Sequence, residues 1–496
     1  MTHLQHYFST TPEGERCSAT IAYLAALDHL ESCSPEVARS IVQELEDQRS
    51  HLKLIASENF CSLATQLAMG NLLTDKYSEG YIHHRFYAGC DNVDDVEEEA
   101  AKQLKEIYGC DHAYVQPHSG SDANLLAFWS ILVQRIQSPA VEELGKKNID
   151  ELTPEEYEQI RQHLCQQKVM GMSLNSGGHL THGYRHNFSS KMMQAVAYDV
   201  DPQTGLLDYE VLRRQVLQEK PTILLAGYSA YPRRLNFATM RDIADSVGAV
   251  LLVDMAHFSG LVAGKVFTGE YDPVPYAHMI TSTSHKTLRG PRGGFVLCSQ
   301  EFADIVDKGC PLVLGGPLPH MMAAKAVAFQ EANTSAFKEY AHCIVENAQA
   351  LANRLQSRGL SVLTGGTDNH LIIVDVSSLG LTGRQGENAL RKAKITVNRN
   401  AIPFDINGPW YTSGLRIGTP AITTLGMGID EMHEIADIII EVLENTSATF
   451  NEKTGKPSKA KSTTPSNVLD EASDRIATLL QQYPLYPEIP MITEST

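Results

Sequence analysis

The middle of the chain alternates short apolar runs with polar turns and helical segments. Residues 222–226 and 249–253 have the length and composition of buried strands, and residues 238–247 between them have a helical pattern. Repetition of this strand–helix–strand unit predicts an α/β fold with a mostly parallel sheet. Ligands of such sheets bind at the carboxyl ends of the strands, so residues that directly follow the strands are the first candidates for a functional site.

A chain of 496 residues exceeds the size at which one hydrophobic core stops growing, so we expect more than one domain. The predicted divisions are an N-terminal arm (1–51), a large domain (52–331) with a surface insertion (137–168), and a smaller α/β domain (332–496). A helical tract at 321–358 is expected to bridge the two domains. Polar residues 451–467 are expected to form a mobile linker to a last helix at 468–482.

Charge and cysteine content exclude several classes of function. The 59 acidic and 41 basic residues give a net charge of -18, which repels nucleic acid and anionic membrane surfaces. No apolar run approaches the roughly 20 residues of a membrane span, and the first residues lack the pattern of a signal peptide. Nine scattered cysteines without a CxxC pair indicate reduced thiols. We therefore expect a cytoplasmic protein with a small-molecule substrate.

Two expected strands place a lysine and a carboxylate at the same edge of the sheet. Asp254 comes directly after the apolar run at 249–253, and His257 follows three residues later. Lys286 follows the apolar residues 279–280. An enzyme that uses pyridoxal phosphate needs a lysine amine for a Schiff base and an acid for the pyridinium nitrogen. A solvated loop lysine is the alternative for Lys286, because lysines are mostly exposed.

A turn of small residues connects an expected strand at 113–116 to a helix that begins near Asp122. Ser119, Gly120 and Ser121 in this turn offer hydroxyl and backbone N–H donors at a helix N-terminus, which is a suitable site for a phosphate group. An ordinary serine-capped helix would have the same sequence, so both interpretations stay open.

Arg416 lies in an apolar strand between two glycines, where an unpaired guanidinium would be costly. Its partner is either an internal carboxylate or the carboxylate of a substrate. His179 and His182 are three residues apart in a glycine-rich loop, but no cysteine or acid nearby in the sequence supplies a third ligand. We therefore expect no metal site and favour ring stacking or hydrogen bonding for these histidines.

Ten ordered motifs resemble those of serine hydroxymethyltransferases from about Leu52 to Glu444: LIASENF, YSEGY, QPHSGSDAN, GGHLTHG, YSAY, LLVDMAHFSGLVAG, TSTSHKTLRGPRGG, GGTDNH, ITVNRN and TSGLRIGTPA. The resemblance implies a fold-type I enzyme with a seven-stranded sheet, a homodimer whose active sites are shared between subunits, and pyridoxal 5'-phosphate as cofactor. The implied reaction converts serine and tetrahydrofolate reversibly to glycine and 5,10-methylenetetrahydrofolate.

The resemblance also implies roles for individual residues. The implied cofactor contacts are Lys286 (Schiff base), Asp254 (pyridinium), His257, His285, His179 (ring stacking), Ser229 (phenolic oxygen), Ser119, Gly120 and Ser121 (phosphate), and Tyr77 and Gly316 (phosphate, from the partner subunit). The implied substrate contacts are Ser57, Tyr87 and Arg416 for the amino acid, Glu79 for the serine hydroxyl and folate, and Leu174, Gly178, Leu180 and Asn400 for folate. Lys286, Glu79, His257 and Tyr87 are the implied catalytic residues.

The chain differs from the family pattern at residues 82–88, at Asp122 and in a shortened glycine loop near Gly316. A threonine aldolase or an alanine racemase on the same scaffold would share the lysine, aspartate and phosphate turn but would not require Glu79 or the folate contacts. A cysteine desulfurase would need a mobile nucleophile, for which Cys310 is the one loose candidate. A binding protein without activity would not need Lys286, Asp254, Glu79 and Arg416 together.

Overall fold

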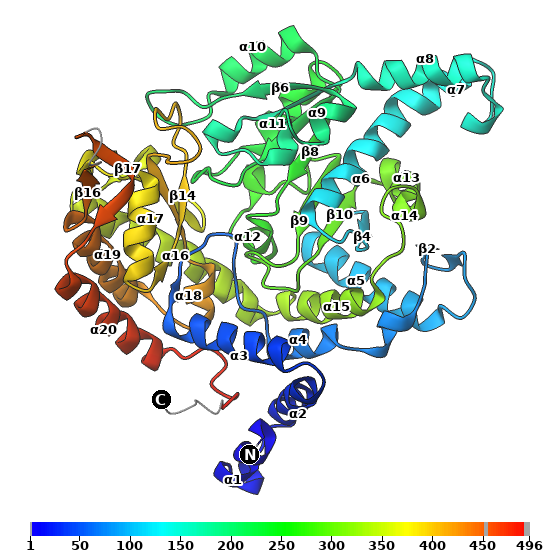
Figure 1. Cartoon of the computed structure of the whole chain (residues 1–496). Helices are drawn as coiled ribbons and strands as arrows, with labels where there is room; N and C mark the ends of the chain where they lie inside the picture. Colours follow the sequence, from blue (N-terminus) through cyan, green and yellow to red (C-terminus); the bar gives the residue numbers. More distant parts are fainter. Residues whose placement is uncertain (1, 451–454, 491–496) are drawn as a thin grey trace.

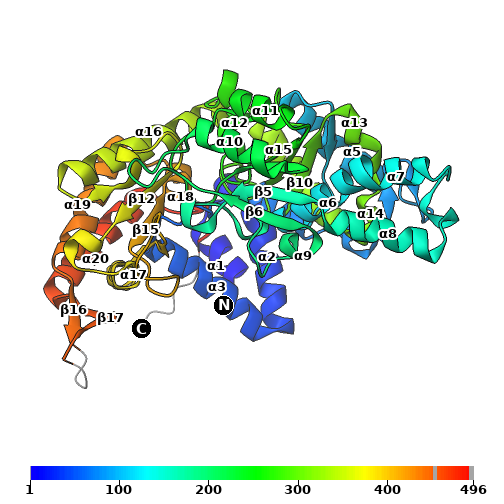
Figure 2. The ribbon, with the colours of Figure 1, turned by 90° about the horizontal axis from the view of Figure 1, so that it is seen from above.

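The computed structural model describes residues 2–450 and 455–490, which form two α/β regions side by side (Figures 1 and 2). The first is built on a seven-stranded sheet with the order β4-β10-β9-β8-β7-β5-β6. β10 runs antiparallel to both of its neighbours, and the other strands are parallel to one another. This arrangement confirms the predicted α/β class with a mostly parallel seven-stranded sheet.

The strands of this sheet are β4 (His112–Tyr114), β5 (Lys168–Met172), β6 (Gln194–Tyr198), β7 (Ile223–Gly227), β8 (Val250–Asp254), β9 (Met279–Thr283) and β10 (Gly294–Cys298). The helices around it are α5 (Asp91–Tyr108), α6 (Gly120–Leu132), α9 (Ser189–Met192), α10 (Tyr209–Glu219), α11 (Phe237–Asp245), α12 (Ser259–Ala263), α13 (Gln300–Asp307), α14 (Gly309–Leu312) and α15 (Pro319–Ala332).

The central strands are apolar on both faces because each face is covered by helices. In β8, Leu251 and Val253 join the core cluster that contains Phe237 of α11, whereas Val250 and Leu252 join the cluster on the other face. Successive side chains of a strand point to opposite faces, so a continuous apolar run is what a doubly covered sheet requires. This burial fixes the strand ends, and with them the candidate site residues.

The second region has a four-stranded sheet with the order β11-β12-β15-β14 and its own core. Its strands are β11 (Ser361–Val362), β12 (Leu371–Asp375), β14 (Asn398–Asn400) and β15 (Gly414–Gly418), and its helices are α16 (Ser335–Ser357), α17 (Gly383–Lys392), α18 (Pro420–Thr424), α19 (Ile429–Glu444) and α20 (Ser466–Gln482). β1 (Leu52–Lys53) pairs in parallel with β13 (Ile395–Thr396), so the chain passes through this core before it enters the first region.

Helices α1 (His3–Thr10), α2 (Ser18–Cys33), α3 (Pro35–Ser50) and α4 (Leu63–Met69) precede the sheets. Leu485 and Ile489, near the other end of the described chain, pack in one apolar cluster with Tyr7 and Leu24. The Arg49 guanidinium donates hydrogen bonds to three carbonyl oxygens of residues 485–489. The expected N-terminal arm is therefore helical and is attached to the C-terminal segment.

Three expectations about individual segments can be compared with the structure. The tract 321–358 is two helices, α15 and α16, which are separated at Asn333 and Thr334. The segment 137–168 contains α7 (Ser138–Glu143) and α8 (Pro154–Cys165), which project from the body in Figure 1.

The third expectation, a mobile linker at 451–467, concerns a segment in which the structure has a strand. β17 (Pro457–Thr463) pairs with β16 (Ser447–Phe450), and Gln385 of α17 donates to the carbonyl oxygens of Ser458 and Lys461. Main-chain hydrogen bonds stabilise this polar strand, which has little apolar surface to signal it. Residues 451–454 of the expected linker lie outside the described residues.

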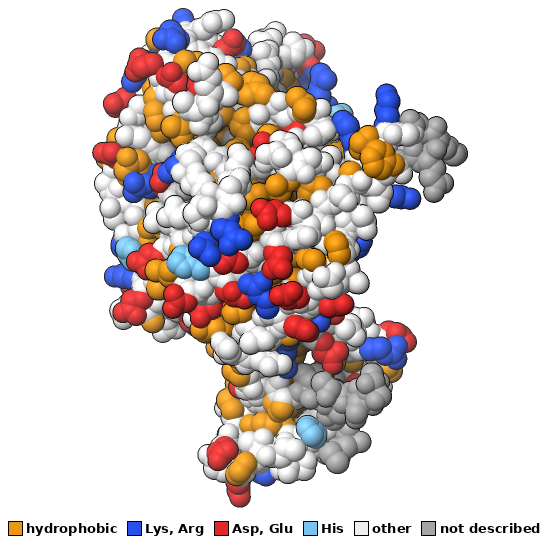
Figure 3. Space-filling view, turned by 90° about the vertical axis from the view of Figure 1, so that its left-hand side faces the viewer, with side chains coloured by type: hydrophobic (Ala, Val, Ile, Leu, Met, Phe, Trp, Pro, Cys, Tyr) orange, Lys and Arg blue, Asp and Glu red, His pale blue; other side chains and the backbone are white. Residues whose placement is uncertain are grey.

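Charged side chains of both signs occur on the described surface. On the face drawn in Figure 3, acidic and basic side chains lie interspersed among polar and apolar ones. Among the residues that the structure describes, no helix combines the length and apolar character needed to cross a bilayer.

Candidate active site

The candidate site lies at the carboxyl ends of β7, β8 and β9. Gly227 at the end of β7 pairs with Asp254 of β8, which in turn pairs with Thr281 of β9. A β-carbon at Gly227 would lie 2.2 Å from the carbonyl oxygen of Asp254, so only glycine allows β7 to approach this closely. The parallel strands therefore bring the predicted residues to one edge, as the sequence pattern indicates.

Asp254 is buried, and its carboxylate accepts three hydrogen bonds. One oxygen accepts hydrogen bonds from Nδ2 of Asn124 (2.9 Å) and Nε2 of His182 (3.1 Å), and the other accepts the backbone N–H of Ala256 (3.1 Å). Burial alone would raise the pKa of Asp254, but the hydrogen bond and charge of His182 hold it below its usual range. The carboxylate is thus ionised and can stabilise a positive charge in front of it.

His179, His182 and Asp254 lie close enough together to hold a metal ion, with their ligand atoms within 4.8 Å of one another. No acid lies close to the two histidines along the chain, but β8 brings Asp254 to their loop from 72 residues away. His179 instead uses Nδ1 for a hydrogen bond with the Thr181 hydroxyl (2.8 Å), and burial lowers its pKa to about 4. A neutral imidazole of this kind can stack on an aromatic ring.

Lys286 follows β9 and is mostly buried. Within residues 2–450 and 455–490, its Nζ has no hydrogen-bond or ion-pair partner. Burial lowers the pKa of Lys286 to about 8, the charge of Asp254 acts in the opposite direction, and Arg416 lowers it further. A desolvated amine near neutral pKa is the nucleophile that Schiff-base chemistry requires.

Arg416 in β15 points across from the second region to the first. Its Nη1 donates to the carbonyl oxygen of Ser229 (2.6 Å) and its Nε to Oδ1 of Asn398 (3.0 Å). In the described part of the chain, no carboxylate lies within ion-pair distance of this guanidinium, and burial lowers its pKa to about 10. The internal acid left open by the sequence is therefore absent there, which favours a carboxylate from a substrate.

Three further histidines, His257, His285 and His370, lie at the site. The ring of His257 stacks on that of His370 with 5.4 Å between centroids, and their Nδ1 and Nε2 atoms are 3.2 Å apart. Burial and then the Lys286 charge keep the pKa of His257 well below its ordinary value. Burial likewise lowers the pKa of His285 to about 3, and its Nδ1 accepts the N–H of Gly293. The rings of His257 and His285 are therefore neutral at physiological pH.

The turn before α6 is a serine-capped helix start that lies among the other site residues. Ser119 caps the helix by accepting the N–H of Asp122, and Gly120 is its first residue. A β-carbon at Gly294 would lie 2.3 Å from the carbonyl oxygen of Ser119, and one at Gly120 would lie 2.7 Å from Thr283. The turn therefore packs directly against the ends of β9 and β10, beside the other site residues.

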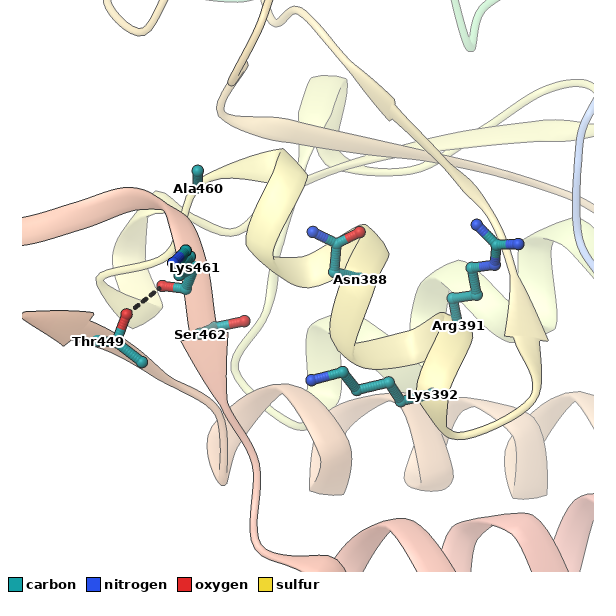
Figure 4. A pocket seen from close by; sticks show the side chains of 7 residues that line it. All are labelled: Asn388, Arg391, Lys392, Thr449, Ala460, Lys461 and Ser462. Atoms are coloured by element: carbon teal, nitrogen blue, oxygen red, sulfur yellow. Dashed lines mark hydrogen bonds between the residues drawn. The ribbon is translucent and has the colours of Figure 1, made fainter.

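The described surface has hollows near the site and away from it. One of about 330 Å³ is lined by Ser57, His285 and Arg292 among others and adjoins the site. The other, of about 570 Å³, lies between α17 and β17, where Lys392 and Ser462 point toward each other (Figure 4). It contains none of the predicted site residues.

Comparison with known proteins agrees with this geometry. The family model "Serine hydroxymethyltransferase" matches residues 30–138 and 157–439. The chain belongs to the serine hydroxymethyltransferase family. A serine hydroxymethyltransferase of Treponema pallidum is 56% identical over 486 residues, covering 98% of this chain and 84% of the relative. One of Chlamydia trachomatis is 56% identical over 476 residues, covering 96% of each chain, and one of Chlamydia abortus is 54% identical over 496 residues, covering 99% and 100%.

Other residues implied by the family lie in a second group, on the hairpin of β2 (Gly80–Tyr81) and β3 (His84–Arg85). The hydroxyls of Tyr77 and Tyr87 each donate to a different oxygen of Glu79, both at 3.4 Å, and the two rings meet edge to face. Desolvation and the Glu79 charge raise the pKa of Tyr87. Gly316 faces the Tyr77 ring. In the described residues, no hydrogen bond or ion pair links this group to Lys286.

The residues implied for folate lie on three segments. Leu174 and Gly178 follow β5, and a β-carbon at Gly178 would overlap the carbonyl oxygen of Met172. Leu180 is 47% exposed in the next loop, which suits a contact with a ligand. Asn400 ends β14 and donates to the carbonyl oxygen of Ala401.

Sequence reasoning missed three residues that position the site: Asn124, His370 and Asn398. Each lies inside one of the ten family motifs, yet its partner lies between 18 and 130 positions away in the chain. For His182 a hydrogen-bonding role was expected, but its partner Asp254 was not. The buried position of Asn124 on an otherwise apolar helix was an available signal.

Proposed function

We propose that this member of the serine hydroxymethyltransferase family transfers the hydroxymethyl group of serine to tetrahydrofolate, giving glycine and 5,10-methylenetetrahydrofolate, with pyridoxal 5'-phosphate as cofactor. One observation carries the proposal. Arg416 is nearly buried and has no carboxylate partner among the described residues, and it lies opposite the Lys286 amine and the ionised Asp254 at one sheet edge. An amino-acid substrate supplies the missing carboxylate.

The residues present fit the cofactor. Lys286 would bind its carbonyl group, Asp254 would hold a proton on its ring nitrogen, and Ser119 with the N-terminus of α6 would bind its phosphate. His179 would stack on the ring, with Ser229 and His257 near its phenolic oxygen. When bound, the cofactor draws electrons away from the substrate bond that breaks.

The protein's own groups orient the substrate and move protons. Arg416 is held on one side by Ser229 and Asn398, so its remaining N–H groups are oriented to form a two-bond pair with the serine carboxylate. Ser57 and Tyr87 complete the amino-acid site. Glu79 would exchange a proton with the serine hydroxyl or with folate, and Leu174, Gly178, Leu180 and Asn400 would contact folate.

The same proposal includes the assembly and the location of the protein. We infer a homodimer, because Tyr77 and Gly316 match residues that reach the phosphate of the partner's site. The functional division is the arm at 1–51, the large domain at 52–331 and the small domain at 332–496. All nine cysteines are free, which is consistent with a reducing compartment such as the cytoplasm.

The test is glycine formation from serine by the purified chain, measured with and without tetrahydrofolate and with Lys286→Ala as the inactive control. We expect formation that depends on both folate and Lys286. Cleavage of serine analogues without any folate dependence would favour a threonine aldolase, and interconversion of D- and L-alanine as the main activity would favour a racemase. Absence of all three reactions in cofactor-loaded protein would contradict the proposal.

A further inference from the structure

Lys325 of α15 is a buried lysine that lies outside the group of active-site residues. Only 2% of the residue is exposed, and its Nζ donates to three backbone carbonyl oxygens: Val115 (2.6 Å), Pro117 (2.9 Å) and Gly294 (2.9 Å). An ammonium group has three N–H donors, so all of them are used. A buried ammonium group is costly unless each of its N–H groups has a hydrogen-bond acceptor, as here.

The three carbonyl groups lie where β4 ends and β10 begins, beside the turn at Ser119–Ser121. Regular pairing of these strands ends at Tyr114 and Val296, and the residues bound by Lys325 lie just beyond that point. Pro117 is two residues from Ser119, a separation of at most about 7 Å along the chain. The lysine therefore fixes the backbone on which the turn is built.

Two glycines make this arrangement possible: Gly293, just before β10, and Gly294, the first residue of β10. A β-carbon at Gly293 would lie 2.4 Å from Cε of Lys325, and one at Gly294 would lie 2.3 Å from the carbonyl oxygen of Ser119. Both contacts are shorter than real side chains tolerate. The glycines thus admit the lysine on one side and the phosphate turn on the other.

The charge of Lys325 is not neutralised by an adjacent acid. Among residues 2–450 and 455–490 it forms no ion pair, and Glu97, the first acid to act on it, is already bound to Arg85 and Gln116. Burial lowers the pKa of Lys325 to about 7, while Glu97 and Asp122 act in the opposite direction. A bound anion at the turn would stabilise the charged form in the same way.

We propose that Lys325 is a positioning residue for the phosphate group, and that it selects a phosphorylated ligand by holding the turn and placing a buried positive charge behind it. This inference rests on the proposed function, since it takes Ser119, Gly120 and Ser121 as the phosphate site. Lys325 does not touch the reacting atoms and acts through the backbone that it binds.

The test compares a ligand with and without its phosphate. Full-length protein freed of cofactor is titrated with pyridoxal phosphate and with pyridoxal, and inorganic phosphate is added separately to measure its effect on Tm. The variants are Lys325→Met, which removes charge and donors, and Lys325→Gln, which keeps two N–H donors but no charge. The matched control is Asn347→Leu, which removes another buried donor to a backbone carbonyl, that of Met427 at 2.9 Å.

In both Lys325 variants the affinity for pyridoxal phosphate should fall at least about tenfold, as loss of a nearby charge in a medium of intermediate dielectric would cause. Pyridoxal affinity should change less than about threefold, and the Tm increase with inorganic phosphate should be lost. Asn347→Leu should lower Tm without changing the ratio of the two affinities.

An equal fall for both ligands, no change for either, or failure of both variants to fold would overturn the proposal, because Lys325 would then be only a residue of the core. If the unmodified protein itself does not bind pyridoxal phosphate through Lys286, the proposed function fails instead. The two failures are therefore distinguishable.

Discussion

The centre around Lys286, Asp254 and Arg416 and the hairpin that carries Glu79 differ in how they are held. The centre is formed by strand ends and short hydrogen bonds, and burial shifts the pKa values of its groups. On the hairpin, Tyr77 and Tyr87 are 59% and 46% exposed and bind Glu79 only through long contacts. One chain thus preorganises the centre around Lys286, Asp254 and Arg416, whereas the tyrosines that bind Glu79 are exposed.

The base of the hairpin is nevertheless firmly attached. Arg85, which lies within the segment 82–88 that differs from the family pattern, donates to Asp94, Glu97 and the carbonyl oxygens of Ser78 and Gly80. These hydrogen bonds stabilise the strands beneath Glu79 and do not involve its carboxylate. This comparison predicts that changes in the centre affect every reaction, and that changes at Glu79 affect only those that need folate.

The largest effect is expected for Lys286→Ala. Without the amine, the protein should not hold pyridoxal phosphate covalently, so the visible absorbance of the bound cofactor should vanish together with all activity. Lys265→Ala removes an exposed lysine that binds the carbonyl oxygen of Ile107 and serves as the control. Absorbance that survives removal of free cofactor in Lys286→Ala would sink the assignment.

A smaller effect is expected for Asp254→Asn. The amide keeps the shape but loses the negative charge that His182 and Asn124 stabilise, so kcat should fall by about 10²- to 10³-fold for folate-dependent and folate-independent reactions alike. Asp272→Asn, at another partly buried acid, should change kcat little. A loss confined to the folate-dependent reaction would break the proposed distinction between the two regions.

For Arg416→Lys the charge remains but the two-bond geometry is lost, so serine affinity should fall about 10- to 100-fold. Cofactor affinity should change less than about threefold. Arg354→Lys, in an ion pair with Asp437, provides the control. Equal weakening of serine and cofactor binding would instead make Arg416 a structural residue.

The depressed pKa of Lys286 also predicts a pH effect on the stability of cofactor-free protein. The folded pKa of about 8 lies below the value of 10.5 for an unperturbed lysine, so the unfolded chain binds more protons between these values. Stability should therefore rise with pH from 8 to 10.5 relative to Lys286→Met, by on the order of 3 kcal/mol. Urea unfolding at several pH values measures this, and parallel curves for the two proteins would contradict it.

The sequence was most informative where strands are buried on both faces. The pattern at 249–253 predicted β8 within one residue and placed Asp254 at its end. β6 was not predicted, because it is an edge strand whose residues are largely exposed and give no apolar run. The β17 strand was missed for a similar reason, since polar residues dominate it and α17 supplies its hydrogen bonds.

Site residues were predictable where they follow strands or match family motifs, and not where their effect depends on tertiary contacts. Nothing local to His182 indicates that it binds Asp254, and nothing local to Arg416 indicates whether a carboxylate lies beside it. Lys325 lies in a helix that also has apolar neighbours, and only the folded chain brings three carbonyl groups to its amine. The domain boundaries stay predictions.

The most direct test of the two-region account is the Glu79→Gln variant, measured in two reactions. Transfer from serine to tetrahydrofolate should fall by about 10²- to 10⁴-fold, as for a lost acid–base group, while folate-independent cleavage of a bulkier 3-hydroxy amino acid should fall much less. Glu158→Gln, at an exposed acid of α8 paired with Arg161, should change neither. Equal loss of both reactions in Glu79→Gln, or loss of neither, would contradict the account.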